Sequence, residues 1–316
     1  MSPTSRSSGA SVEIRTGFAN SEAISGDLKL YYEDFGDVDD PPVLLIMGLG
    51  AQLLLWRTAF CERLVGQGLR VIRYDNRDVG LSTKTPKAGA GQPLVPRLLR
   101  FWFGLRGDAA YALEDLADDA AAVLDHLGIE RAHVVGASMG GMIAQVFAAR
   151  FAERTKSLAV IFSSNNRPFL PPPAPRALLA VLKGPPPGSP LDVIVDNVVR
   201  VTKITGSPRY QAPEERVRAE AIEGYERSYY PWGVAHHFSA IMASGSLLGY
   251  NRRTVAPTVV IHGRADKLMP PSGGRAVARA IDGARLVLFD GMGHDLPQQL
   301  WDRLIGVLTS NFGDAG

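Results

Sequence analysis

The sequence predicts an α/β protein in which a mostly parallel sheet is flanked by helices and interrupted by an inserted helical segment. Short apolar runs recur along the 316-residue chain, and helix-like stretches separate them. Such alternation implies crossover connections between parallel strands. Between residues 166 and 252 the alternation stops, and proline-rich stretches and amphipathic segments replace it. That break predicts a helical insertion between two strands of the sheet.

Eight segments are predicted to be strands. The first two alternate with a period of two, and most of the others are continuous apolar runs, as expected of strands buried on both faces of a parallel sheet. In chain order the predicted strands are 11–18, 28–36, 41–50, 69–75, 131–138, 157–164, 257–263 and 285–290. The helix-like stretches between them are 52–66, 112–127, 140–151, 273–281 and 298–311, and the insertion adds amphipathic segments at 190–204 and 213–230.

These elements divide the chain into four parts. Residues 1–24 are expected to form an N-terminal tail and the first strand, and 25–165 the first part of the core. Residues 166–252 are the helical insertion, and 253–316 complete the core. A chain of this length is long enough for one large domain that carries an inserted subdomain.

Composition narrows the class of protein. With 46% hydrophobic and 21% charged residues the sequence is typical of a globular protein in water, and a net charge of +2 is too small to indicate nucleic-acid binding. The single cysteine, Cys61, excludes an internal disulfide and a multi-cysteine zinc site, and we expect it to be buried. No apolar run reaches about 18 residues or resembles a secretory signal, which predicts a cytoplasmic protein without a transmembrane segment.

The most informative motif is HVVGASMGGMIAQ at 133–145, where a serine lies between glycines at the end of an apolar run and the start of a helix-like stretch. A sharp turn there needs glycine at positions 136 and 140, and it projects the Ser138 hydroxyl above the sheet edge. The next backbone N–H, that of Met139, points the same way from a helix N-terminus, which favours negative charge. The motif predicts a nucleophile with half of an oxyanion hole, against the plainer interpretation of a structural turn.

A serine nucleophile requires a general base, and the base requires an orienting acid. His294 lies in a glycine-flanked loop after the last predicted strand, whereas the other five histidines lie in strands, near a helix end or in the insertion. Asp266 follows the next-to-last strand, and the loop after 157–164 offers no carboxylate. Asp290 and Asp295 are too close in sequence to His294 to orient it easily. The predicted catalytic set is therefore Ser138, Asp266 and His294.

Together these motifs resemble the α/β-hydrolase superfamily over nearly the whole chain from about residue 25. The stretches MGLGAQLLLW, YDNRDVGLST, GASMGGMIAQ, HGRADKLMP and GMGHDLP are similar to actinobacterial LipG-type lipase/esterases and aclacinomycin methylesterase-like hydrolases. The order of the catalytic set along the chain agrees with this superfamily. One departure is Met47, which stands where most relatives have a histidine before the glycine. That histidine is not a triad member.

The resemblance has three further implications. The fold is expected to be an α/β-hydrolase fold with an eight-stranded sheet. The second oxyanion-hole donor is expected to be the backbone N–H of Leu49, beside that of Met139. Residues 166–252 are expected to form a cap, or lid, over the site.

The predicted function is hydrolysis of carboxylic esters, lipid-like or otherwise apolar, through a Ser-Asp-His triad and an acyl-enzyme. No metal or organic cofactor is expected, and the partner is a small-molecule or lipid ester. Alternatives on the same fold are acyl thioester hydrolysis, C–C bond hydrolysis and cofactor-free perhydrolysis. A non-catalytic binding protein that kept the scaffold is a further alternative, which the intact catalytic set disfavours.

Four aromatic side chains are candidates for substrate contact: Trp102, Phe103, Tyr230 and Trp232. The first two belong to PLVPRLLRFWFGLRG at 93–107, which interleaves apolar residues with arginines in an unusually long connection. Two interpretations stay open for this segment. It packs under the cap and walls the acyl pocket, or part of it stays exposed and makes a peripheral contact with a membrane, its arginines toward anionic headgroups.

Overall fold

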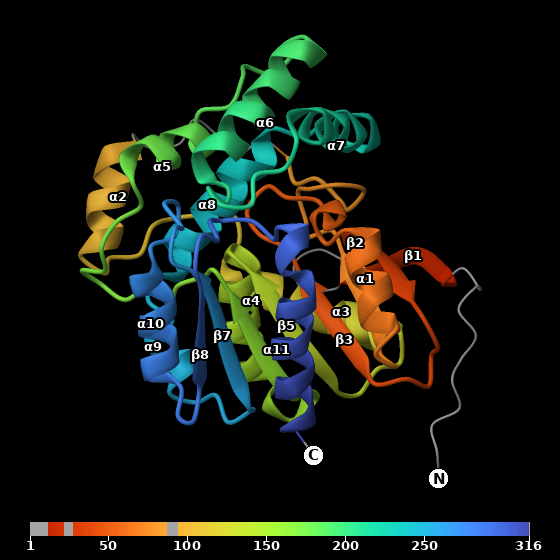
Figure 1. The fold of residues 1–316 in the computed structure, drawn as a ribbon. Helices are drawn as coiled ribbons and strands as arrows, with labels where there is room; N and C mark the ends of the chain where they lie inside the picture. Colours follow the sequence, from red (N-terminus) through yellow and green to blue (C-terminus); the bar gives the residue numbers. More distant parts are fainter. Residues whose placement is uncertain (1–11, 22–27, 87–93, 316) are drawn as a thin grey trace.

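The computed structural model describes residues 12–21, 28–86 and 94–315, and its centre is an eight-stranded sheet (Figure 1). The strand order is β1-β2-β4-β3-β5-β6-β7-β8. Strands β1 and β2 pair antiparallel, β2 and β4 pair antiparallel, and the remaining pairs are parallel. The bounds are Ile14–Ser21, Leu28–Phe35, Pro42–Ile46, Arg70–Tyr74, Ala132–Ala137, Thr155–Ile161, Thr258–Gly263 and Arg285–Phe289. The mostly parallel sheet predicted from the sequence is confirmed.

Both faces of the sheet are covered by helices, which explains the continuous apolar runs. Alternate residues of each inner strand enter two separate cores: Val134 packs with α3 and α4, whereas Val135 packs with α1 and α11. The helices outside the insertion are α1 (Thr58–Val65), α2 (Leu94–Trp102), α3 (Leu113–His126), α4 (Met139–Arg150), α10 (Pro271–Ala280) and α11 (Trp301–Gly313). Short 3-10 turns lie at Leu53–Leu55, Ala152–Arg154 and Gln298–Leu300. Cys61 is fully buried in α1, as expected, and burial raises the pKa of its thiol to about 12.

The segment between β6 and β7 is helical, and it contains no strand. Its helices are α5 (Pro175–Leu182), α6 (Leu191–Thr205), α7 (Glu214–Arg227), α8 (Trp232–Ser244) and α9 (Leu248–Asn251). Helices α5 to α8 lie over one end of the sheet (Figure 1). None of the described helices is long and apolar enough to cross a bilayer.

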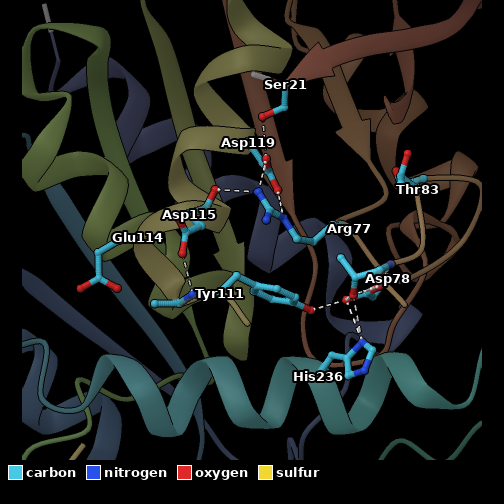
Figure 2. Close-up of polar contacts among 12 residues, drawn as sticks. Ser21, Arg77, Asp78, Thr83, Tyr111, Glu114, Asp115, Asp119 and His236 are labelled. Atoms are coloured by element: carbon cyan, nitrogen blue, oxygen red, sulfur yellow. Dashed lines mark hydrogen bonds and ion pairs between the residues drawn. The ribbon is translucent and has the colours of Figure 1, made fainter. Parts of the chain in front are cut away.

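A buried ion pair anchors the loop after β4. Both oxygens of Asp119, on α3, accept hydrogen bonds from the Arg77 guanidinium, at 2.6 and 2.7 Å, and the Ser21 hydroxyl donates to the same carboxylate (Figure 2). Asp75 accepts the backbone N–H groups of Leu53 and Leu81. Asp75 and Arg77 therefore support this loop through hydrogen bonds.

Candidate active site

Ser138 occupies a sharp turn between β5 and α4, with backbone angles of φ 58° and ψ −123°. Two close backbone approaches make this turn possible. A Cβ atom on Gly136 would lie 2.1 Å from the carbonyl oxygen of Gly140, and one on Gly140 would lie 2.1 Å from the carbonyl oxygen of Ile46. Contacts this short exclude any side chain. The glycines on either side of Ser138 are therefore explained by packing of the strand against the helix.

The structure brings Ser138, Asp266 and His294 together at the carboxyl ends of three strands. Nε2 of His294 lies 2.9 Å from Oγ of Ser138, and its Nδ1 lies 2.7 Å from Oδ2 of Asp266. Because a carboxylate accepts only, Nδ1 donates to Asp266, and Nε2 is left to accept the serine proton. Asp266 follows β7, and His294 follows the edge strand β8.

Asp266 is held in place by its surroundings. Its Oδ1 accepts the backbone N–H groups of Leu268 and Met269, at 2.9 and 2.8 Å, so that Oδ2 alone faces His294. His262 packs behind the carboxylate, with Nε2 donating to the carbonyl oxygen of Met269 at 2.8 Å. Burial lowers the pKa of His262, which favours the neutral ring there. His262 is thus a backbone-bonded histidine at the end of β7.

The loop that carries His294 is fastened by residues of the insertion that sequence reasoning missed. The backbone N–H of His294 donates to the carbonyl oxygen of Thr205, and that of Gly293 donates to Oγ of Ser207, both at 2.8 Å. The Ser207 hydroxyl in turn donates to the Asp295 carboxylate. No spacing rule in the sequence joins residues 205–207 to residues 293–295.

The two other carboxylates near His294 have their own partners. Asp290 forms an ion pair with Arg264, 2.7 Å apart, where both side chains are largely exposed. Asp295 accepts from Ser207, and burial raises the pKa of its carboxyl group. Their sequence proximity to His294 predicts that they are poor orienting groups, and Asp266 is the carboxylate that contacts the imidazole.

The loop after β3 passes directly beside Ser138. A Cβ atom on Gly48 would lie 2.9 Å from Cβ of Ser138, so only glycine allows this approach. Leu49 and Met139 both line the cavity at this point. The loop is also tied to the insertion, because the backbone N–H of Gly50 donates to Nδ1 of His237 on α8, at 3.0 Å. The opposite nitrogen of His237 bonds to the carbonyl oxygen of Arg77 at 2.7 Å.

Ser138 opens into a cavity of about 1140 Å³ between the sheet, α2 and the insertion. This is slightly larger than the usual ligand pocket of roughly 300–1,000 Å³. Its walls are mainly apolar and come from the strand ends, α2, α5, α6 and α8, and they include Met139, Met142, Leu98, Phe101, Leu170, Leu178, Val181, Val198, Val201, Phe238, Ile241, Met242 and Met269. The walls also contain charged side chains, namely those of Arg57, Arg167, Arg216, Glu220 and Asp295. Among the described residues, no group of three or more His, Cys, Asp or Glu side chains could hold a metal ion.

Of the four aromatic candidates for substrate contact, Trp102 lines this cavity and the other three lie outside it. Phe103 is 58% exposed, because it turns away from the cavity at the end of α2. Tyr230 instead donates its hydroxyl to the carbonyl oxygen of Thr85, on the core side of the insertion. Trp232 begins α8 away from the cavity wall, to which that helix contributes Phe238, Ile241 and Met242.

Comparison with known proteins places this architecture in a family. The family model described as "alpha/beta hydrolase fold" matches residues 41–297, which include Ser138, Asp266, His294 and the insertion. This chain belongs to the α/β-hydrolase fold family. The sequence motifs predict this membership, and the match to the family model confirms it.

Curated relatives of this α/β-hydrolase are hydrolases of small molecules. It is 30% identical over 307 residues to rhodomycin D methylesterase DnrP of Streptomyces peucetius, covering 90% of this chain and 95% of the relative. It is 28% identical to a 2-hydroxy-6-oxononadienedioate/2-hydroxy-6-oxononatrienedioate hydrolase of Cupriavidus pinatubonensis, covering 74% and 72% of the two chains. These relatives support hydrolase activity in this chain.

A solved structure agrees on the fold. A meta-cleavage product hydrolase from Pseudomonas fluorescens IP01 superposes on this α/β-hydrolase with a TM-score of 0.72 at 21% identity, over 95% of this chain and 98% of the other.

Proposed function

We propose that this α/β-hydrolase cleaves carboxylic esters of apolar compounds, with Ser138 as nucleophile, His294 as general base and Asp266 as the orienting acid. One observation carries the proposal: an unbroken hydrogen-bonded series from Oγ of Ser138 through His294 to Asp266 opens into a large apolar cavity. A hydroxyl, an imidazole and a carboxylate in this order form the arrangement that activates serine for acyl transfer.

The acylation step follows from the geometry. Ser138 attacks the ester carbonyl while Nε2 of His294 takes the hydroxyl proton, and the charge of Asp266 stabilises the resulting imidazolium. The backbone N–H groups of Leu49 and Met139 are the proposed donors to the oxyanion, and each donor of this kind contributes roughly 3–4 kcal/mol in comparable enzymes. His294 then returns its proton to the leaving alcohol, and the C–O bond breaks.

Deacylation repeats these steps with water. Nε2 of His294 removes a proton from the attacking water, the two N–H groups hold the oxyanion again, and Ser138 leaves with the proton that His294 returns. The products are a carboxylic acid and the free enzyme. Every proton transfer uses one atom, Nε2, which explains why Nδ1 must be occupied by Asp266 throughout.

The proposed substrate is lipid-like or otherwise apolar, and residues 166–252 are proposed to act as the cap. Helices α5, α6 and α8 of that segment contribute apolar side chains to the wall of the cavity into which Ser138 opens. The likeness to a protein named as a rhodomycin D methylesterase supports ester cleavage. The likeness to a hydrolase of 2-hydroxy-6-oxononadienedioate supports C–C bond hydrolysis as the second candidate, with the same Ser138 and His294 as its polar groups.

The decisive experiment measures hydrolysis of p-nitrophenyl and methyl esters of increasing chain length, alongside acyl-CoA thioesters and a 2-hydroxy-6-oxo-dienoate. We expect ester turnover to dominate, and Ser138→Ala to lower kcat by at least about 10³-fold. A Ser138→Ala protein that keeps more than about a tenth of the wild-type kcat excludes Ser138 as the nucleophile. Faster turnover of the dienoate or the thioester would select that chemistry instead of ester hydrolysis.

A matched pair of variants tests the acid. Asp266→Asn removes the carboxylate that contacts Nδ1, so we expect it to lose most of kcat, whereas Asp290→Asn leaves an exposed ion pair incomplete and keeps kcat. Comparable losses in the two variants would mean that the orienting acid is misassigned.

A further inference from the structure

An exposed cluster of apolar side chains surrounds α2 and the start of the insertion. Val95, Leu99 and Trp102 follow one another at helical spacing along α2, and each is at least 41% exposed. Phe103 and Leu105 follow at the end of the helix, and Phe169 joins them from the insertion at 60% exposure. We call these six side chains the α2 patch. Large apolar side chains gathered on one exposed surface indicate a contact site.

The α2 patch is held in a defined arrangement, because hydrogen bonds join its two segments. The indole N–H of Trp102 donates to the carbonyl oxygen of Leu170 at 3.2 Å, and the backbone N–H of Phe169 donates to the carbonyl oxygen of Trp102 at 3.2 Å. The rings of Trp102, Phe103 and Phe169 meet edge to face, with centroids 5.1 to 5.8 Å apart. The exposed rings are thereby held at fixed positions.

Exposed charge in the segments that carry the α2 patch is mostly positive. The sequence contains no aspartate or glutamate between 79 and 107 or between 154 and 191; the nearest acid after α2 is Asp108. Five exposed basic side chains lie in the same segments: Arg100, Arg106, Arg167, Arg176 and Lys183. Apolar rings flanked by cations complement a surface that offers hydrocarbon beneath negative charge.

The α2 patch is also continuous with the cavity. Val95, Leu99 and Trp102 are exposed on one side and line the cavity of Ser138 on the other, beside Leu98 and Phe101. An apolar molecule held in a bilayer against this patch would reach the cavity along apolar side chains. A second copy of the chain would bring the exposed Arg100 and Arg106 of both copies close together, which disfavours self-association there.

We propose that the α2 patch docks this protein on anionic lipid bilayers, with its rings in the interfacial region and its basic side chains against the headgroups. Phe103 and Phe169 insert beside Trp102, whose amphipathic ring suits the interface. Docking is measured without turnover, so it stands apart from the ester hydrolysis proposed above.

The test is co-sedimentation of the full chain with vesicles of phosphatidylcholine, alone or mixed with phosphatidylglycerol. We expect binding to the mixed vesicles at low salt, release at high salt, and much weaker binding to phosphatidylcholine alone, because headgroup attraction is screened by salt. Failure to co-sediment with the mixed vesicles at low salt overturns the proposal, and so does equal binding to both kinds of vesicle.

Two double variants locate the contact. Arg100→Gln with Arg106→Gln should weaken partitioning about 30-fold, since each arginine near an anionic surface contributes about a five-fold factor. The matched control, Arg131→Gln with Arg252→Gln, changes two exposed arginines elsewhere and should stay within about two-fold of wild type. Equal losses in the two pairs would show that net charge, and not the α2 patch, drives binding.

The rings are tested in the same way. At intermediate salt, where headgroup attraction is partly screened, the double variant Trp102→Ser with Phe103→Ser should no longer bind the mixed vesicles. The control pair, Val38→Ser with Val255→Ser, changes two exposed side chains outside the patch and should still bind. Because all four sites are exposed, circular dichroism should report folded protein in each case, and the arginine pair remains decisive if one variant misfolds. Sedimentation velocity completes the test: a dimer that dissociates in the Trp102/Phe103 variant would assign the patch to a second copy and overturn membrane docking.

Discussion

At Ser138 the position of the hydroxyl depends on an unfavourable backbone conformation. A positive φ in a residue other than glycine costs on the order of 1–3 kcal/mol and persists only where surrounding packing enforces it. Here the enforcing contacts are the close approach of Gly136 to Gly140 and the hydrogen bond from the Ser138 N–H to the carbonyl oxygen of Ile161 at 2.9 Å.

Replacing Ser138 by glycine should therefore stabilise the protein while removing the proposed nucleophile. Relief of the strain outweighs the larger entropy of a glycine in the unfolded chain, and we expect Ser138→Gly to raise the free energy of unfolding by about 1 kcal/mol over Ser138→Ala. Urea unfolding of the two variants gives this difference directly. If the alanine variant is the more stable, the turn at Ser138 is not strained.

Sequence reasoning brought together the three side chains now proposed as catalytic, because each follows a strand and parallel strands end at one edge of the sheet. Ser138 could be recognised from its glycines, and Asp266 and His294 from their positions after the last two strands. Thr205 and Ser207 could not be recognised, because their contacts with the His294 loop span about 90 residues and depend on how the insertion folds back.

At the scale of single elements, the inner strands and their helices were predictable, since apolar runs and helical spacing report burial directly. Strand β1 is shifted: it was predicted at 11–18 and runs from Ile14 to Ser21, because its pairing with β2 continues past Phe18 to Ser21, opposite Leu28. The sequence of 93–107 predicts either a buried cavity wall or an exposed face, yet α2 lines the cavity and is exposed at once. A residue pattern cannot separate these two environments when a helix forms the rim of a cavity.

The imidazole of His237, on α8, ties the insertion to the loop after β3, which carries Leu49 as a proposed oxyanion donor. Nδ1 of His237 accepts the Gly50 N–H, and Nε2 donates to the carbonyl oxygen of Arg77. The adjacent His236 contacts Asp78, which also accepts the Tyr111 hydroxyl (Figure 2). We infer that His237 is a positioning residue, because the residue before Gly50 carries one of the two proposed donors.

Two isosteric replacements separate the bonds of His237. In His237→Asn the side-chain oxygen takes the place of Nδ1 and keeps the bond to Gly50, whereas His237→Gln keeps only the donor toward Arg77. We expect kcat of the glutamine variant to fall about ten-fold below that of the asparagine variant at similar KM, because a loosened loop misplaces the oxyanion donor. Equal kcat values would reduce His237 to a packing role.

At the scale of the whole molecule, buried neutral histidines make stability depend on pH. Burial lowers the pKa of His237 and of His133 to about 4, against about 6.5 in an unfolded chain. The unfolded state therefore binds more protons between these values. Stability is complete above about pH 6.5 and is lost as the pH falls toward 4.

Urea unfolding at pH 7 and pH 5 measures this loss. Each such histidine should lower the free energy of unfolding by about 2 kcal/mol between the two pH values. His237→Asn has no titrating ring at that position, so its difference between pH 7 and pH 5 should be smaller than that of wild type by about this amount. An unchanged difference would show that His237 is protonated in the folded protein.

The position of His294 beside an edge strand has a kinetic consequence. Strand β8 pairs with β7 alone, and four of its five residues are incompletely buried, whereas β5, which precedes Ser138, lies fully buried between two neighbours. Edges of a sheet open more often than its interior. On heating, His294 should leave the nucleophile while the central strands are still protected from hydrogen exchange. The working lifetime of this enzyme is then set by the fraying of one peripheral strand, and it ends before the global melting transition.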